Sequence, residues 1–470
     1  MELYDYQDDC LAQTHQAYRQ GFNAPLLVMP TGAGKTMTFA CATQKASIRG
    51  KRVLLVAHRR ELVGQISEAL SRWDVPHGMI SPAHPPTTQG VQVAMAQTLA
   101  RRIPLDRDGR FRFDLVIVDE AHHATQDSTW GAILKHNAGA KFLGVTATPC
   151  RLDGKGLGVQ AGGFFDFMVI GPTVEDLIAR GRLAPPVVYA PEFGADLSGV
   201  KKRGGDYDSK GLAAAMENAK LTGDVVAHYR QLCAGAPSIA FTVDTKHAAM
   251  VADEFKAAGY AAAVLTGSTQ DKERAAMIKD LGAGRLNVLA SCNVISEGTD
   301  IPMVMAAILL RPTMSFALAM QQMGRALRAF PGKDKAIILD HAGNTHKHGL
   351  PTEQVEWSLD GVIRKGGGKV RTCFGCGGLL GVAVRVCPAC GKDVGGKGTE
   401  SPKTEQEDAF LLVKEGKLIE LTPELRREMQ NWRRTQQQKA KSLEDFMKIG
   451  ERMGYHPNWA AYRFRELQHG

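Results

Sequence analysis

The sequence has no apolar run long enough to cross a lipid bilayer, and its first residues carry neither the basic start nor the apolar core of a secretory signal. We therefore expect a cytoplasmic protein with no membrane partner. A disulfide scaffold is also unexpected, because five of the nine cysteines are scattered singly along the chain and the other four are clustered near its end.

Charge imbalance is nearly absent from residues 1–360, which hold 38 Lys and Arg against 36 Asp and Glu. Residues 361–470 hold 20 against 13, so most of the net charge of +9 lies there. This distribution favours a polyanionic partner for the C-terminal part, although a solvated charged surface would give the same count. With 470 residues, the chain is long enough for several domains with complete cores.

Short apolar segments alternate with helical segments in two blocks of the chain, which predicts two α/β units with parallel sheets. A boundary between the blocks is marked by Gly171-Pro172 and Pro185-Pro186. The strands expected in the first block are residues 26–29, 53–57, 91–95, 115–118 and 142–145. Those expected in the second are residues 238–242, 261–265, 288–290, 305–310 and 336–339.

A glycine-rich segment, Pro-Thr-Gly-Ala-Gly-Lys-Thr at 30–36, follows the first expected strand and precedes a segment at 37–48 that can be helical. This order is typical of the loop that holds polyphosphates in nucleotide hydrolases. Lys35 would reach the β- and γ-phosphates of ATP, and the Thr36 hydroxyl would bind Mg²⁺. The phosphates would be surrounded by backbone N–H groups of Thr31, Gly32, Ala33 and Gly34.

Two carboxylates follow the expected strand at 115–118, in the sequence Asp119-Glu120-Ala121-His122. An acidic residue at this end of a strand supplies a second contact to Mg²⁺ in phosphate-loop folds, and we assign that role to Asp119. Glu120 would orient and deprotonate the attacking water. His122 would couple this site to the second block.

These motifs resemble those of superfamily two DEAD/DEAH-box helicases. Within that superfamily the chain is most similar to RadD-like and phage-borne DNA helicases, through residues 171–178, 309–313, 331–333 and 338–344. The resemblance implies two tandem RecA-like domains, an ATP-binding one at 1–175 and a helicase C-terminal one at 176–360. It further implies ATP-dependent movement on nucleic acid, with single-stranded or branched DNA favoured over RNA. Work in repair, recombination or phage replication, with unidentified repair or replication partners, would fit this kinship.

The resemblance also assigns roles to residues outside the phosphate loop and the acidic pair. Gln7 would read the adenine base, and Thr146 and Thr148 would link hydrolysis to motion. The fifth motif would place Gly298 and Asp300 near the nucleotide. Contacts to the nucleic-acid backbone would come from Arg59, Gln97 and Thr98.

The segment from Gln321 to Arg328 matches the sixth motif of the family, Gln-x-x-Gly-Arg-x-x-Arg. Negative charge accumulates on the γ-phosphoryl group during transfer, and a guanidinium stabilises it. Gln321, Arg325 and Arg328 would therefore be catalytic, and they would reach ATP only when the two blocks close. Arginines at these positions could instead make only interdomain salt bridges.

Four cysteines in the C-terminal part have the spacing of a tetrahedral Zn²⁺ site: Cys373, Cys376, Cys387 and Cys390. A redox dithiol or an iron–sulfur cluster is the alternative. We expect a zinc ribbon at 370–394 and a basic, mostly helical tail at 408–470. The ribbon could hold nucleic acid or brace the motor, and the sequence does not separate these two roles.

Two other functions compete with a DNA helicase. One is an RNA helicase or remodeller, and the other is a catalytically silent zinc-ribbon protein that binds nucleic acid. The second is disfavoured because Lys35, Thr36, Asp119, Glu120, Arg325 and Arg328 are all intact. No constellation of carboxylates and lysine typical of a nuclease is found in the sequence.

Overall fold

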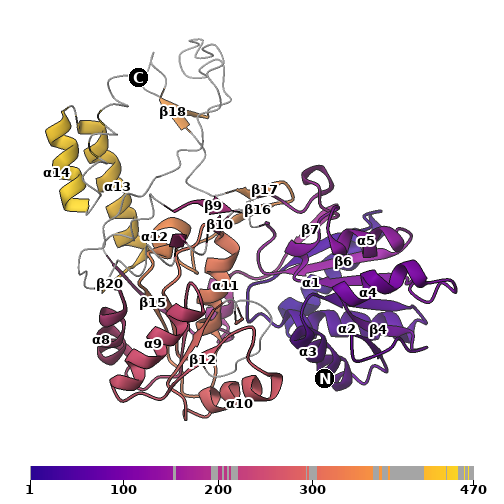
Figure 1. The fold of residues 1–470 in the computed structure, drawn as a ribbon. Coiled ribbons are helices and arrows are strands. Elements are labelled where there is room, and N and C mark those ends of the chain that lie inside the picture. The colour runs from indigo at the N-terminus through magenta and orange to yellow at the C-terminus, as the bar shows by residue number, and fades with distance from the viewer. Residues whose placement is uncertain are drawn as a thin grey trace.

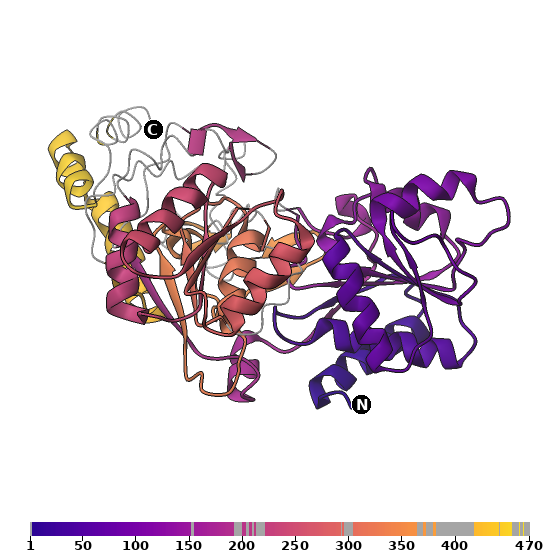
Figure 2. The same cartoon turned by 60° about the horizontal axis from the view of Figure 1, so that its bottom comes forward.

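The computed structural model describes residues 2–151, 155–191, 200–203, 206–208, 211–212, 221–292, 294–295, 304–363, 370–372, 379–381, 418–440, 442–453, 460 and 464. It contains two α/β domains that lie side by side in both ribbon views (Figure 1, Figure 2). Each domain is built on a seven-stranded sheet. The predicted pair of parallel-sheet units is therefore confirmed.

The first domain has an entirely parallel sheet in the order β3-β4-β2-β5-β6-β1-β7. Its strands are β1 Pro25–Val28, β2 Val53–Ala57, β3 Gly78–Ile80, β4 Val91–Met95, β5 Leu115–Asp119, β6 Lys141–Thr146 and β7 Phe167–Ile170. Its helices are α1 Asp5–Arg19, α2 Lys35–Ile48, α3 Arg60–Arg72, α4 Ala96–Arg102, α5 Thr129–His136 and α6 Val174–Ala179. All five strands predicted for this block are present.

Helices cover both faces of this sheet because its central strands are apolar on both sides. In β1, Leu27 packs into one hydrophobic cluster, whereas its neighbours Leu26 and Val28 pack into another. Successive side chains of a strand point to opposite faces, so a strand buried on both faces needs a continuous apolar run. The parallel arrangement brings the carboxyl ends of β1, β5 and β6 to one edge of the sheet.

The second domain has the strand order β12-β13-β11-β14-β15-β8-β20, parallel except for β20. Its strands are β8 Pro186–Pro191, β11 Ser238–Phe241, β12 Ala262–Leu265, β13 Val288–Ser291, β14 Ala306–Leu309, β15 Ala336–Asp340 and β20 Leu418–Glu420. Its helices are α8 Leu221–Cys233, α9 Thr245–Ala257, α10 Asp271–Gly282, α11 Phe316–Leu327 and α12 Asn344–His348. The five predicted strands again appear, each within one residue of the expected bounds.

A short hairpin, β16 Glu356–Ser358 and β17 Gly361–Ile363, follows the second domain and returns to the first. Gly156 N and Gly158 N of the first domain donate to the carbonyls of Asp360 and Leu359, at 2.9 and 2.8 Å. Trp357 packs against the core of the first domain and lies 5.7 Å from the ring of Phe316 at the start of α11. The hairpin therefore bridges the two domains.

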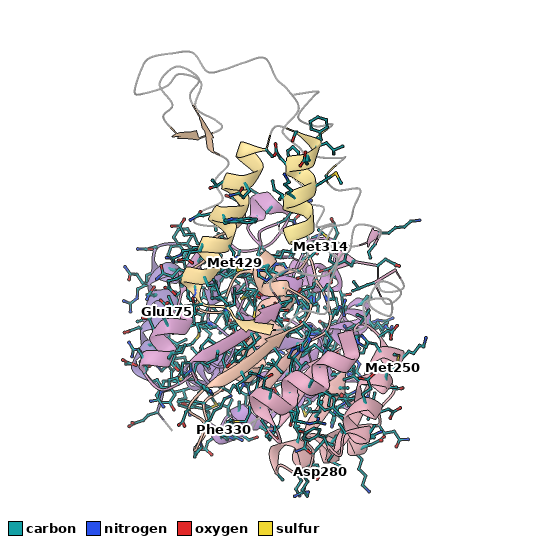
Figure 3. The ribbon with its side chains drawn as sticks, turned by 90° about the vertical axis from the view of Figure 1, so that its left-hand side faces the viewer. Glu175, Met250, Asp280, Met314, Phe330 and Met429 are labelled. Atoms are coloured by element: carbon teal, nitrogen blue, oxygen red, sulfur yellow. The ribbon has the colours of Figure 1, made fainter. Side chains whose placement is uncertain are left out.

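Helices α13 Pro423–Lys439 and α14 Leu443–Met453 stand on the far side of the second domain from the first (Figure 1). In the side view, Met429 on α13 is labelled near the body of the domain, against whose core it packs (Figure 3). Phe446 and Ile449 of α14 join a small separate cluster with Ala440 and Ala460. Over the described part of the chain, no helix combines the length and the apolar character that a membrane span requires.

Candidate active site

The glycine-rich loop follows β1 and ends at the start of α2. Gly34 precedes α2 with a φ of +79°, and Gly32 has a φ of +88°, values that only glycine adopts without strain. A Cβ at Gly32 would lie 2.7 Å from Leu183 Cδ2 and 3.6 Å from Arg328 Cγ. A Cβ at Gly34 would overlap the side-chain amide of Gln7. Both glycines are thus required by conformation and by space.

Lys35 is the first residue of α2 and lies at the centre of a charged cluster. Its Nζ donates to the carbonyls of Met29 and Pro30, both at 3.4 Å. Burial lowers the pKa of Lys35, and the nearby carboxylates of Glu120 and Asp119 oppose that shift. The guanidinium groups of Arg325 and Arg328, from the second domain, add to the lowering of this pKa. Lysine, carboxylates and arginines from both domains therefore act on one another electrostatically.

The acidic pair lies at the carboxyl end of β5, as the sequence predicted. Asp119 is 5% exposed and Glu120 is 9% exposed. Burial, and then the charge of Glu120, raise the pKa of Asp119 to about 7. Glu120 has a φ of +49°, and its N–H donates to Asp119 Oδ1 at 3.0 Å. A non-glycine residue held in the left-handed region is strained, and such strain is concentrated at functional sites.

A short polar relay connects the acidic pair to the end of β6. His122 Nδ1 lies 3.4 Å from Glu120 Oε2 and 3.0 Å from Thr146 Oγ1. Thr146 Oγ1 in turn donates to the Thr148 carbonyl and accepts from the Thr148 N–H, both at 3.2 Å. The three residues expected to couple hydrolysis to motion are therefore joined in a chain of hydrogen bonds, with Thr146 in the middle.

Helix α11 of the second domain packs onto the glycine-rich loop. A Cβ added at Gly324 would lie 3.0 Å from Thr31 Cβ. A cavity of about 260 Å³ adjoins this contact, and its lining includes Thr31, Thr148, Gln321 and Gly324. Gln321 Nε2 and Thr148 Oγ1 are buried and lack a hydrogen-bond partner among the described residues. Unsatisfied buried polar atoms of this kind fit a site that takes a polar ligand.

Gln7 lies beside the loop, in the first turn of α1. Its Nε2 donates to the carbonyls of Ala33 and Gly34, at 3.1 and 3.4 Å. Its Oε1 accepts from the Tyr4 N–H at 3.0 Å. The structure therefore connects the segment expected to read adenine to the segment expected to hold phosphates.

The three residues expected to contact nucleic acid lie at the starts of α3 and α4. Arg59 is half-buried, and its Nη1 donates to the Val294 carbonyl of the second domain at 2.9 Å. Gln97 is exposed and Thr98 is half-buried. Six other candidate residues, Gly298, Asp300, Cys373, Cys376, Cys387 and Cys390, lie outside the described residues.

One contact at this site was not anticipated from the sequence. Leu183, in the connection between the domains, is buried and lies against Gly32, and it pairs with Arg328 through an antiparallel bridge. Its neighbour Ala184 donates its N–H to the Leu327 carbonyl at 2.7 Å. In the sequence, Leu183 is an apolar residue in a segment that we interpreted as a boundary.

Oxygen ligands suited to Mg²⁺ are present at the loop and at β5. The hydroxyl of Thr36 and the carboxylate of Asp119 are the donor types that this ion prefers, together with water and substrate phosphates. A Mg²⁺ ion there would hold phosphate oxygens and offset the charge that raises the pKa of Asp119. The residues present therefore fit the ion.

Comparison with known proteins assigns both domains to helicase-type families. Residues 1–151 match the family described as type III restriction enzyme, res subunit, and residues 226–330 match the helicase conserved C-terminal domain. The chain is 32% identical over 375 residues to a 51.5 kDa protein of a Lactococcus phage, covering 78% of each chain. It is 25% identical over 382 residues to a protein named DNA 3'-5' translocase from Sulfurisphaera tokodaii, covering 72% of this chain and 81% of that one.

Saccharomyces cerevisiae has a relative named "Putative ATP-dependent helicase IRC3", 30% identical over 362 residues. The match covers 73% of this chain but only about half (51%) of the yeast protein. Among solved structures, an ATP-dependent type ISP restriction-modification enzyme bound to DNA shares the fold, with a TM-score of 0.53 and 18% identity over 72% of this chain and 28% of that one. The chain belongs to the superfamily 2 DEAD/DEAH-type helicases and is an ATP-hydrolysing enzyme of that family.

Proposed function

We propose that the protein is a DNA-stimulated ATPase that moves along or remodels single-stranded or branched DNA, in repair, recombination or phage replication. The observation that carries this proposal is the packing of α11 onto the glycine-rich loop, which brings Arg325 and Arg328 of the second domain close enough to act electrostatically on Lys35 of the first. DNA is favoured over RNA by the similarity to RadD-like helicases and by the relative named as a DNA translocase. In this proposal residues 1–175 and 176–360 are the two motor units.

The charged cluster can perform phosphoryl transfer to water. Lys35, Arg325 and Arg328 would stabilise the negative charge that develops on the γ-phosphoryl group. Glu120 would orient the attacking water and accept its proton, and the unpartnered Nε2 of Gln321 would donate to the same region. Mg²⁺ held by Thr36 and Asp119 would neutralise phosphate charge.

Hydrolysis would be coupled to domain closure because the catalytic groups come from both domains. Release of the γ-phosphate would remove the ligand that joins Lys35 to the two arginines, and the domains could then separate. The relay from Glu120 through His122 to Thr146 would report the state of the nucleotide to the end of β6. Thr148 lies at the far end of that relay and lines the same cavity as Gln321 and Gly324 of α11.

Nucleic acid would run across both domains at the edge that carries the starts of α3 and α4. Arg59, Gln97 and Thr98 would contact its sugar–phosphate backbone, which gives affinity without sequence preference. Arg59 contacts Val294 of the second domain, so nucleic acid bound at Arg59 would contact both motor units.

The four clustered cysteines would form a structural zinc ribbon at 370–394. A closed site of four thiolates leaves no open position for catalysis, so the metal would stabilise the fold of this segment. Metal analysis of the purified protein tests this directly. We expect one Zn²⁺ per chain, lost in a Cys387→Ser/Cys390→Ser variant, and a metal content that does not change with this substitution would contradict the ribbon.

Phosphate release in the presence of different polymers tests the main proposal. Single-stranded, duplex and forked DNA and RNA would be compared at equal nucleotide concentration, with Glu120→Gln as the hydrolysis-deficient control. We expect DNA to stimulate turnover more than RNA, and the variant to bind ATP with turnover lowered about 100-fold or more. Stronger stimulation by RNA would favour an RNA remodeller, and equal rates with and without polymer would contradict a nucleic-acid motor.

A further inference from the structure

Lys333 lies in the loop between α11 and β15, away from the acidic pair, and it is only 8% exposed. Its Nζ donates to three backbone carbonyls: those of Val304 at 2.6 Å, Arg328 at 2.9 Å and Ala326. The ring of Phe330 lies 5.0 Å from the same nitrogen. A buried ammonium is costly unless all of its donors are used, and here all three N–H groups have an acceptor.

Two of the three acceptors belong to the end of the helix that carries the arginines. The last carbonyls of an α-helix have no partner within the helix, and a positive charge at that end is favourable. Ala326 is in the last turn of α11, and Arg328 directly follows it. The carbonyl between them, that of Leu327, accepts from the Ala184 N–H of the interdomain connection. Three successive carbonyls are thus fixed, two by Lys333 and one by the connection.

This arrangement fixes the backbone positions from which the side chains of Arg325 and Arg328 extend. Arg325 lies in the last turn of α11, so its position depends on that turn remaining helical. Arg328 leaves the helix in an extended conformation, with φ −57° and ψ 128°, and its Cγ lies 3.6 Å from where a Cβ on Gly32 would be. The third acceptor, the carbonyl of Val304, lies just before β14. Lys333 therefore also joins the end of α11 to the segment that enters β14.

We infer that Lys333 is a positioning residue for ATP hydrolysis, which holds the end of α11 so that Arg325 and Arg328 meet the glycine-rich loop. The inference rests on the proposed function of the two arginines. Lys333 acts through backbone carbonyls and does not touch the nucleotide. Its loss should therefore lower turnover while leaving nucleotide binding in place, because the binding loop belongs to the other domain.

The test compares Lys333→Gln, which has no charge and one donor fewer, with Lys333→Arg, which keeps the charge. Lys335→Gln is the matched control, because Lys335 is exposed and only two residues away. For each protein the kcat of DNA-stimulated hydrolysis, the affinity and stoichiometry for a fluorescent ATP analogue and the thermal unfolding midpoint are measured. We expect Lys333→Gln to lose about 10- to 100-fold in kcat with nucleotide affinity changed less than about threefold, as a displacement near 1 Å in a catalytic group does. Lys333→Arg should recover most of the loss, and Lys335→Gln should match the unmodified protein.

A double-mutant cycle separates positioning from general stability. Once Arg328→Gln has removed one of the groups that Lys333 positions, adding Lys333→Gln should cost clearly less than it does alone. Fully multiplicative losses, or a normal kcat in Lys333→Gln with full nucleotide stoichiometry, would overturn the inference. A normal kcat in Arg328→Gln and in Arg325→Gln would instead overturn the proposed role of the arginines. If Lys333→Gln does not fold, a kcat of Lys333→Arg as low as that of Arg328→Gln at full stoichiometry would count against positioning by charge.

Discussion

Gly324 of the second domain faces Thr31 of the first so closely that a Cβ at Gly324 would lie 3.0 Å from Thr31 Cβ. The contact joins the arginine-bearing helix α11 to the glycine-rich loop at a point between Gln321 and Arg325. A Cβ at Gly324 would already crowd Thr31, and a larger side chain would push the two domains apart. The close approach of the two domains that the proposed chemistry needs therefore depends on a glycine at position 324.

Replacing Gly324 with valine should block domain closure. We expect kcat to fall about 10- to 100-fold, because the arginines would be displaced from the loop, while affinity for nucleotide changes little. Steady-state phosphate release and titration with a fluorescent nucleotide measure the two effects. Gly64→Val is the control, since Gly64 lies inside α3 with open space around the corresponding position. A Gly324→Val protein as active as the control would show that closure does not need this contact.

Gly34→Ala should weaken ATP binding. Its φ of +79° costs an alanine about 1–2 kcal/mol, and the new Cβ would overlap the Gln7 amide. Gly50→Ala is a matched control, because Gly50 has a φ of +72° and no heavy atom near its Cβ position. We expect nucleotide affinity to fall at least about tenfold in Gly34→Ala, equivalent to about 1.4 kcal/mol, and to stay unchanged in Gly50→Ala. Equal affinities in calorimetric titrations would contradict a role for this geometry in holding ATP.

The sequence predicted ten strands, nine of which lie between two other strands of their sheet, because continuous apolar runs have a strong local signal. It did not predict the edge strands β3, β7 and β20 or the inner strand β8. We interpreted Pro185-Pro186 as a boundary, yet β8, which begins at Pro186, pairs with β15, about 150 residues later in the chain. Pairing partners at that separation leave no local pattern.

The candidate site was likewise predicted in part from the sequence. The glycine-rich loop and the acidic pair were enough to place Lys35 near Asp119, because strand ends of a parallel sheet meet at one edge. The expectation that Arg328 joins them came from the sixth motif of the family. The contacts of Leu183 and Lys333 were not predicted, since they depend on how the connection between the domains crosses the end of α11. A family pattern specifies the groups that react, and the tertiary structure specifies the groups that position them.

Thr146→Val should separate ATP hydrolysis from mechanical work. Valine keeps the shape of threonine but removes the hydroxyl that lies 3.0 Å from His122 Nδ1 and bonds to Thr148. We expect DNA-stimulated hydrolysis to stay within about threefold, and displacement of a third strand from a DNA triplex to fall about tenfold or more, because the report from the nucleotide no longer reaches α11. Thr43→Val removes a comparable buried hydroxyl, which donates to Phe39 within α2, and should affect neither assay. Parallel losses in both assays of Thr146→Val would assign Thr146 to hydrolysis itself.

The pH dependence of kcat should show whether the positive charge of Lys333 is needed for hydrolysis. Burial lowers the pKa of Lys333 to about 8, so the ammonium is charged at neutral pH and becomes a neutral amine as the pH rises. The neutral amine has one N–H fewer and cannot satisfy all three carbonyls, whereas the arginine in Lys333→Arg stays charged throughout. We therefore expect the ratio of wild-type kcat to Lys333→Arg kcat to be constant below about pH 7 and to fall about tenfold between pH 7 and pH 9.

Taking this ratio removes the titration of other groups that both proteins share, including Asp119, whose pKa is raised to about 7 by burial. None of the acceptors of Lys333 can contribute, because all three are backbone carbonyls, and the neighbouring Arg328 keeps its charge over this range. Unfolding midpoints measured at each pH check that both proteins remain folded. A ratio that stays level from pH 6 to pH 9.5 would mean that the charge of Lys333 does not set the position of the arginines.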